Sequence, residues 1–186
     1  MTGSLEHGPP FELSFTVNGE RKTVHAYPME RLLDTLRQQL GLTGAKEGCG
    51  EGECGSCSVL MDGALVNSCL VPVLQARDAD IVTIEGLGAV GRLNDLQEAF
   101  LQCGGAQCGI CTPGMILAAA HLLRKNPGPT MEEIREGLSG NLCRCTGYMQ
   151  IFESVAEAMR RRDSATPCDP IRPITNWLRQ ARCRRW

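Results

Sequence analysis

The stretch Cys49-Gly50-Glu51-Gly52-Glu53-Cys54-Gly55-Ser56-Cys57 places three thiols within nine residues, and a fourth cysteine follows at Cys69. Its glycines permit backbone conformations with φ > 0 and a close approach of the main chain to whatever the loop surrounds. Successive backbone N–H groups in such a loop can point at one compact, negatively charged group. The stretch therefore predicts a backbone cage whose ligands are Cys49, Cys54, Cys57 and Cys69.

The spacing of these cysteines separates two kinds of metal centre. A Cys-x4-Cys-x2-Cys loop with a distant fourth cysteine is typical of a [2Fe–2S] cluster. Zinc also accepts four thiolates, but zinc sites usually pair two short hooks, whereas here one loop carries three cysteines. The spacing favours an iron–sulfur cluster, and zinc or reduced structural thiols remain as alternatives.

The chain has 186 residues and 11 cysteines. This length fits one or two domains, and two small ones are favoured. Because Met1–Pro10 holds no basic and apolar leader and no long apolar run occurs, we expect a cytoplasmic protein with no membrane segment. The cytoplasm keeps thiols reduced, so clustered cysteines indicate metal binding rather than disulfides. The histidines, His7, His25 and His121, are scattered and support neither a Rieske centre nor a Cys/His zinc finger.

The charge of the chain is unevenly placed. The net charge is −2, but Arg160–Trp186 carries eight arginines against Asp163 and Asp169. That segment is therefore strongly basic, and the body that precedes it is acidic. An acidic body argues against nucleic acid as the main partner.

The first half of the chain predicts strands and one helix. Alternation of apolar and polar residues over Phe11–Val17 is typical of a half-buried strand, and Leu32, Leu33, Leu36 and Leu40 recur at helical spacing. Asn18-Gly19 and Asp62-Gly63 predict hairpin turns. The predicted elements are strands at Phe11–Val17, Arg21–Ala26, Ser58–Met61, Ala64–Asn67 and about Asp80–Ile84, and a helix at Glu30–Leu40. A helix that crosses a mixed sheet gives a small α+β domain, similar to the β-grasp fold of plant-type ferredoxins.

The second half of the chain predicts only helices. Glycines punctuate Glu85–Gly91, where we place the domain boundary. Asn94 or Asp95 is expected to cap the first helix, and Thr130 with Glu133 forms a capping box. The predicted helices are Leu96–Leu101, Gly114–Lys125, Met131–Leu138 and Ile151–Arg161. Four helices with short connections predict a compact four-helix bundle.

A second set of thiols lies among these helices, as Cys108-Gly109-Ile110-Cys111 and Cys143-Arg144-Cys145. Each pair immediately precedes a predicted helix, with Thr112 or Thr146 as the expected N-cap. Two helix N-termini would then direct their positive dipole ends at one metal centre, which favours an anionic cluster that accepts an electron. Zinc is a stronger alternative here, because paired hooks are typical of zinc sites.

The two thiol sets together resemble a known family. The motifs that carry the resemblance are Glu47–Cys57, Gly105-Ala106-Gln107-Cys108-Gly109-Ile110-Cys111-Thr112-Pro113-Gly114 and Gly140-Asn141-Leu142-Cys143-Arg144-Cys145-Thr146-Gly147-Tyr148. In this order they are similar to the iron–sulfur subunit of the molybdenum hydroxylases, the xanthine dehydrogenase family, over about Phe11 to Arg161. The resemblance implies a ferredoxin-like domain at 1–85, a helical domain at 86–163 and two [2Fe–2S] clusters, and leaves 164–186 as a basic tail, disordered or docked on a partner.

The resemblance also implies a role for the chain. It implies an oxidoreductase subunit that relays electrons from molybdopterin, on a large partner subunit, through both clusters to FAD on a medium one. Gln107 and Cys145 would contact the pterin, and the assembly would be a dimer of heterotrimers. Purines or other N-heterocycles are the expected substrates, with carbon monoxide, aldehydes, nicotine-like compounds and aromatic thioesters as alternatives.

Two other interpretations remain open. A free-standing ferredoxin would need only the first domain, and a zinc-stabilised interaction module would have no redox role. Three cysteines lie outside both ligand sets: Cys103, Cys168 and Cys183. Cys103 is expected to be a small buried apolar residue.

Overall fold

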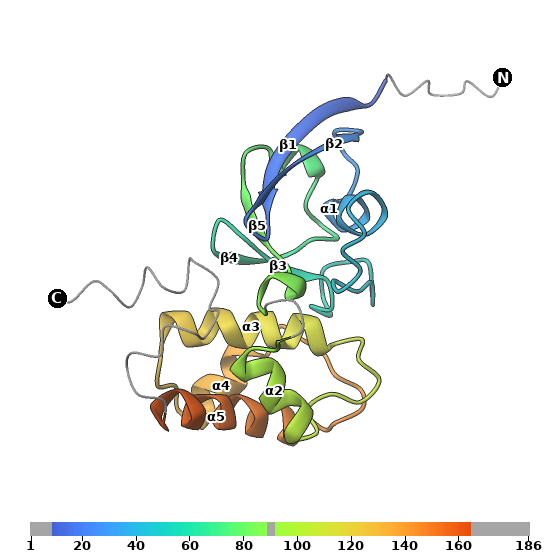
Figure 1. Ribbon diagram of the computed structural model, residues 1–186. Helices are drawn as coiled ribbons and strands as arrows, with labels where there is room; N and C mark the ends of the chain where they lie inside the picture. The colour runs from blue at the N-terminus through green and yellow to red at the C-terminus, as the bar shows by residue number, and fades with distance from the viewer. Residues whose placement is uncertain (1–8, 89–91, 165–186) are drawn as a thin grey trace.

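The structure is a computed structural model that describes residues 9–88 and 92–164. A mixed sheet occupies the first part of the chain and helices the second (Figure 1), so the architecture of the described residues is α+β. The expected tail at 164–186, with Cys168 and Cys183, lies almost wholly outside the described residues. No helix in the described part of the chain is long and apolar enough to cross a membrane.

The sheet has five strands in the order β2-β1-β5-β3-β4. Strands β1 (Phe11–Val17) and β2 (Glu20–Ala26) form an antiparallel hairpin, as do β3 (Ser58–Met61) and β4 (Ala64–Asn67). Strand β5 (Asp80–Val82) is parallel to β1 and antiparallel to β3. The predicted turns are confirmed, because φ is positive at both central residues of each, Asn18 and Gly19 in one and Asp62 and Gly63 in the other.

The helix predicted at Glu30–Leu40 differs from the observed segment. A single α-helical turn, α1 (Leu32–Asp34), continues into a π-helical turn, η1 (Thr35–Gln39), in which the Leu40 N–H donates to the Thr35 carbonyl at 3.3 Å. Leu32, Leu33 and Leu36 are nevertheless fully buried. The leucine stripe therefore packs as predicted, with a wider hydrogen-bonding pattern.

Strand β5 ends earlier than predicted, since the prediction extended to about Ile84. Its pairing with β1 stops at Val17, where the chain turns, and the side chain of Asn18 then binds Thr83 through two hydrogen bonds of 2.9 Å. The chain continues into a short 3₁₀ turn, η3 (Ile84–Gly86), and a second such turn, η2 (Val73–Ala76), precedes β5.

The four helices of the second half are α2 (Asp95–Gln102), α3 (Thr112–Lys125), α4 (Met131–Gly137) and α5 (Met149–Ser164). The predicted caps of two of them are confirmed. Asn94 forms a capping box with Gln97 at the start of α2, and Thr130 forms one with Glu133 at the start of α4. Helix α2 packs on α5, and α3 lies between the other helices and strand β3 (Figure 1).

Two apolar cores result from this arrangement. One lies between the sheet and the α1–η1 segment, with Leu13, Phe15 and Leu36 at its centre. The other lies among the helices, but Leu60 of β3 and Val82 of β5 also belong to it. Because the sheet contributes to the helical core, the two halves of the chain pack directly on one another.

Candidate metal centres

The first thiol loop folds around its own sulfur atoms. The backbone N–H groups of Glu51 and Cys54 each donate to the sulfur of Cys49 at 3.4 Å, and the N–H of Cys49 donates to the sulfur of Cys54 at 3.4 Å. Gly50, Gly52 and Gly55 all have positive φ, the conformation that glycine adopts at no steric cost. The loop is thus a concave backbone with N–H groups directed at thiols, as predicted.

The two other thiols of this set come from buried positions. Cys57 and Cys69 are buried and their side chains interact with each other, whereas Cys49 is exposed. Burial raises the pKa of the Cys57 thiol to about 12, while the N–H groups of Glu51 and Cys54 lower the pKa of the Cys49 thiol to about 7. The set therefore joins an outer pair, Cys49 and Cys54, to an inner pair, Cys57 and Cys69.

The second set also combines a buried thiol with exposed ones. The side chain of Cys111 interacts with that of Cys143, and the side chain of Cys145 with that of Cys108. Cys111 is buried and its burial raises the pKa of that thiol to about 12, whereas Cys108 and Cys145 are exposed. The structure thus brings together all four predicted cysteines, two from the segment before α3 and two from the segment after α4.

The predicted helix caps beside this set are wrong. Cys111 occupies the N-cap position of α3, and Thr112 lies inside the helix with its hydroxyl oxygen buried and no hydrogen-bond partner within the described residues. Helix α5 begins only at Met149, so Thr146 is not its cap. Because α3 begins at Thr112, Pro113 is the second residue of the helix, and its missing N–H falls among the first-turn donors that have no partner within the helix. Only the N-terminus of α3 therefore follows its thiols directly.

Thr146 instead holds a thiol. Its hydroxyl lies 3.3 Å from the sulfur of Cys143, and its N–H donates to the same sulfur at 3.5 Å. Burial disfavours the thiolate of Cys143, but the hydrogen bonds from Thr146, Cys145 and Cys111 together lower the pKa of that thiol. Thr146 thus stabilises the charged form that a metal requires.

Tyr148 is a site residue to which sequence reasoning gave no role. Its hydroxyl accepts a hydrogen bond from the N–H of Cys143 at 3.0 Å, and its φ is 72°. A non-glycine residue with positive φ is uncommon and costs free energy. The only sequence signal was its place in the Thr-Gly-Tyr run after Cys145, which does not reveal that the side chain folds back.

The pairing of the thiols fits a two-iron group better than a single ion. Among the residues that the structure describes, no three His, Cys, Asp or Glu side chains converge on a point suited to one metal ion. The strongest side-chain interactions among the thiols join Cys49 with Cys54 and Cys57 with Cys69 in the first set, and Cys111 with Cys143 and Cys145 with Cys108 in the second. A four-cysteine [2Fe–2S] cluster has two iron atoms to ligate, so two pairs match its donor requirement, whereas a tetrahedral zinc site needs one point of convergence.

Gln107, which directly precedes Cys108, and Cys145, which belongs to the second set, are both exposed. They are therefore accessible to a neighbouring molecule, and their contact with a pterin stays a prediction. Cys103 is half-buried at the end of α2 rather than buried, and it belongs to neither set.

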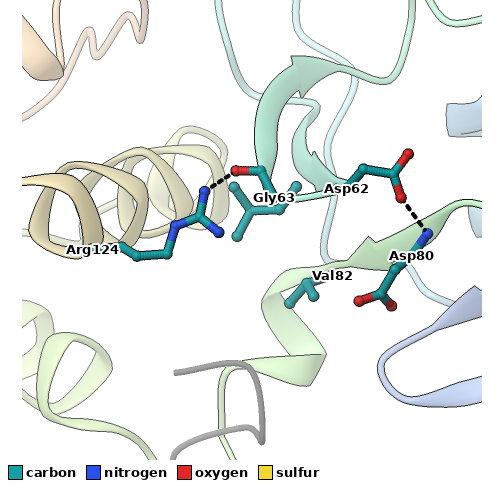
Figure 2. Close-up of a pocket in the computed structure, with 6 residues that line it drawn as sticks. Asp62, Gly63, Asp80, Val82 and Arg124 are labelled. Carbon is teal, nitrogen blue, oxygen red and sulfur yellow. Dashed lines mark hydrogen bonds between the residues drawn. The ribbon is translucent and has the colours of Figure 1, made fainter. Parts of the chain in front are cut away.

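A pocket of about 200 Å³ lies away from the thiols, where α3 meets the sheet (Figure 2). Arg124 donates to the carbonyl of Gly63 there, and the carboxylate of Asp62 accepts from the N–H of Asp80 at 2.8 Å. The residues that line it are Leu60, Asp62, Gly63, Asp80, Val82 and Arg124. The pocket belongs to the packing of the two halves, and none of the predicted site residues lines it.

Comparison with known proteins matches both halves to iron–sulfur families. Residues 15–81 match the 2Fe-2S iron-sulfur cluster binding domain, and residues 83–156 match the [2Fe-2S] binding domain. The sheet half is accordingly a ferredoxin-like 2Fe-2S domain.

Curated relatives include small subunits of larger enzymes. The nicotinate dehydrogenase small FeS subunit of Eubacterium barkeri is 50% identical over 149 residues, which cover 80% of this chain and 95% of that one. The xanthine dehydrogenase iron-sulfur-binding subunit of Escherichia coli O157:H7 is 41% identical over 160 residues, which cover 85% of this chain and 100% of that one. Both relatives match this chain over nearly their whole length.

Solved structures agree with these matches. A chain of quinoline 2-oxidoreductase from Pseudomonas putida 86 superposes with a TM-score of 0.78 at 45% identity, covering 83% of this chain and 98% of that one. The aldehyde oxidoreductase of Desulfovibrio gigas superposes with a TM-score of 0.79 at 41% identity, over 84% of this chain but only 18% of that one. The same unit is thus found both as a separate chain and as part of a longer one.

Proposed function

This chain belongs to the small iron–sulfur subunits of the molybdenum hydroxylases, the xanthine dehydrogenase family, and we propose that it relays electrons from molybdopterin on a large partner subunit to FAD on a medium one. It is an electron-transfer subunit of a multi-subunit oxidoreductase, with 2Fe-2S cofactors. The finer path, from pterin to flavin, is the proposal.

The ligands in this proposal are the two thiol sets. Cys49, Cys54, Cys57 and Cys69 hold the first cluster, and Cys108, Cys111, Cys143 and Cys145 hold the second. When bound, each cluster supplies one-electron transfer at a potential that its hydrogen bonds and solvent exposure set. The chain's own contribution is to hold the thiolates, direct N–H groups at them and limit the access of water.

The observation that carries the relay is the contact between the two sets. The N–H of Leu142, which precedes Cys143, donates to the carbonyl of Cys54 at 2.9 Å. Each set also has at least one exposed thiol. In the first set it is Cys49, and in the second set both Cys108 and Cys145 are exposed. Two centres whose ligand loops are hydrogen-bonded to each other, and which reach the surface separately, suit electron passage between two different partners.

We extend the proposal to the pterin contact. Gln107 and Cys145 are exposed beside the second set, which supports their placement against the molybdopterin of the large subunit. The first set would then face the flavin.

The substrate proposed for the assembled enzyme is a purine or another N-heterocycle. Relatives of this chain are named for nicotinate, nicotine, xanthine and quinoline, all of which are nitrogen heterocycles. Aldehyde oxidoreductases match as well, so an aldehyde is the second candidate. Carbon monoxide and aromatic thioesters stay as further alternatives.

The remaining expectations belong to the same proposal. They comprise a β-grasp domain at 1–85, a four-helix-bundle domain at 86–163, a basic tail at 164–186, a dimer of heterotrimers in the cytoplasm, and no nucleic-acid or membrane partner. Support for the domains comes from the two apolar cores, although Leu60 and Val82 link them.

The experiment is purification of the full chain, tagged, from its own host, followed by anaerobic addition of candidate substrates. We expect a large and a medium protein to co-purify, and nicotinate, xanthine or quinoline to bleach the visible absorbance of the complex. Bleaching by aldehydes alone would move the assignment to the second candidate. A chain that purifies alone with reducible centres would be a free-standing ferredoxin instead.

A further inference from the structure

One buried side chain joins the two thiol loops. Asn141 lies two residues before Cys143 and is only 3% exposed. Its side-chain N–H donates to the carbonyl of Gly55 at 2.9 Å, and Gly55 lies between Cys54 and Cys57 of the first set. A single amide therefore connects backbone segments that are 86 residues apart in the sequence.

The space around this amide is closely filled. A Cβ added to Gly55, whose φ is +68°, would lie 2.4 Å from the side-chain nitrogen of Asn141. A Cβ added to Gly114 would lie 2.1 Å from the carbonyl oxygen of Gly55 and 2.9 Å from the same nitrogen. Asn141 thus lies against the first loop and against Gly114 in the first turn of α3, three residues after Cys111.

The carbonyl of Gly55 does not need the amide of Asn141 in order to have a hydrogen-bond partner. Ser58 also donates to the Gly55 carbonyl, from its hydroxyl at 2.7 Å and from its N–H at 3.1 Å. The carbonyl would keep partners if the amide of Asn141 were removed. What the amide provides is a side-chain link between the halves, next to the hydrogen bond from Leu142 to Cys54.

We propose that Asn141 is a positioning residue that fixes the separation and relative orientation of the two clusters, an inference that rests on the proposed relay. Functional groups must be held to within about 0.5 Å of their working geometry by packed, hydrogen-bonded neighbours. Electron exchange between two centres falls steeply with their separation. A buried link between the two ligand loops therefore sets the efficiency of exchange without ligating either cluster.

The test is Asn141→Ala in the full chain. We expect iron content and the reduction potential of each centre to match the wild type, while the magnetic interaction between the two reduced centres, measured by electron paramagnetic resonance, is lost or weakened. The matched control is Asn126→Ala, which removes an amide hydrogen bond of 3.1 Å to Glu133 within the helical half. The control should leave the interaction unchanged.

A second variant reaches the same junction differently. Gly114→Ala keeps Asn141 but adds a methyl group that the Gly55 carbonyl must move away from, so it should weaken the interaction too. A wild-type interaction in Asn141→Ala overturns the proposal, as does an equal loss in Asn126→Ala. Loss of iron from both junction variants also overturns it, because the residue would then serve cluster assembly. A wild-type chain without two reducible centres would instead refute the proposed relay.

Discussion

At the scale of single residues, Tyr148 gives the most direct test of how the second set is supported. Tyr148→Phe removes the acceptor for the N–H of Cys143, and an unsatisfied group of this kind costs roughly 1–3 kcal/mol. We expect a lower free energy of unfolding and faster iron loss from the second centre, measured by urea titration and chelator release. Tyr27→Phe, at the only other tyrosine of the chain, is the control, and equal effects of both variants would contradict the role.

Single ligand replacements should fail in different ways. Cys54→Ser removes a thiol from the first set, so the molybdenum-proximal signal should persist while electrons no longer reach the flavin. Cys111→Ser removes a buried thiol at the start of α3, so it should disturb the helical half and the pterin contact. Rapid mixing of the complex with substrate measures both. Full turnover from substrate to flavin in both variants would show that the ligand assignment is wrong.

Gln107 belongs to the residue scale as well. Gln107→Leu should preserve both clusters and the fold of the isolated chain, because the side chain is exposed there. In the complex, a polar edge of the pterin would lose its partner at a cost of roughly 1–3 kcal/mol, so molybdenum content or the rate of cluster reduction should fall. Gln75→Leu, at an exposed glutamine of the sheet half, is the control. Unchanged values for both quantities would leave Gln107 an ordinary surface residue.

At the scale of elements, the capping box of α4 gives a prediction with a pH dependence. The N–H of Thr130 donates to the carboxylate of Glu133 at 2.7 Å, and this bond holds the pKa of Glu133 below its usual value. Thr130→Ala removes the hydroxyl that accepts from the Glu133 N–H, so it should lower the free energy of unfolding by about 1 kcal/mol at neutral pH.

The sign of the pH effect follows from the direction of the shift. A carboxylate with a lowered pKa stabilises the fold above its unfolded pKa, and that contribution is lost as the pH falls through the folded value. Glu133→Gln should therefore lower the free energy of unfolding less at acidic pH than at neutral pH. Urea titrations at the two pH values would measure this difference. Glu132→Gln is the control on the same turn, and a pH-independent effect of Glu133→Gln would contradict the assignment.

Elements whose signal is local were predictable from the sequence, and others were not. Asn18-Gly19 needs φ > 0 at both residues, so its turn can be read from two letters. The same holds for the caps at Asn94 and Thr130, whose partners lie three residues away. The π-helical turn after Asp34 and the early end of β5 depend on contacts with strands distant in sequence, which the local pattern does not carry.

The candidate site also has parts that the sequence could predict and parts that it could not. Cysteine spacing could predict both sets of four, because a cluster restricts which loop lengths can surround it. The cap predictions at Thr112 and Thr146 failed, because Thr112 is already the first residue of α3 and the turn at Tyr148 delays α5. The links made by Tyr148 and Asn141 require knowing which loops meet, so no spacing rule could reveal them.

At the scale of the whole molecule, we predict two distinct iron–sulfur centres in one chain. The first set sits in a glycine-rich loop and the second beside a helix N-terminus, so their surroundings differ. Reduction with dithionite should give two overlapping paramagnetic signals with different relaxation, and analysis should find about four iron atoms per chain. Stoichiometric zinc with no reducible chromophore would refute both centres and favour the zinc-stabilised module.

The link from Asn141 to Gly55 also has a consequence for timing during synthesis. The two residues are separated by 86 positions, and ribosomes add roughly 5–20 residues per second. The first thiol loop therefore leaves the ribosome roughly 4–17 seconds before the segment that carries Asn141. For that interval, the loop lacks its side-chain link to the second half of the chain, and the arrival of Asn141 makes that link.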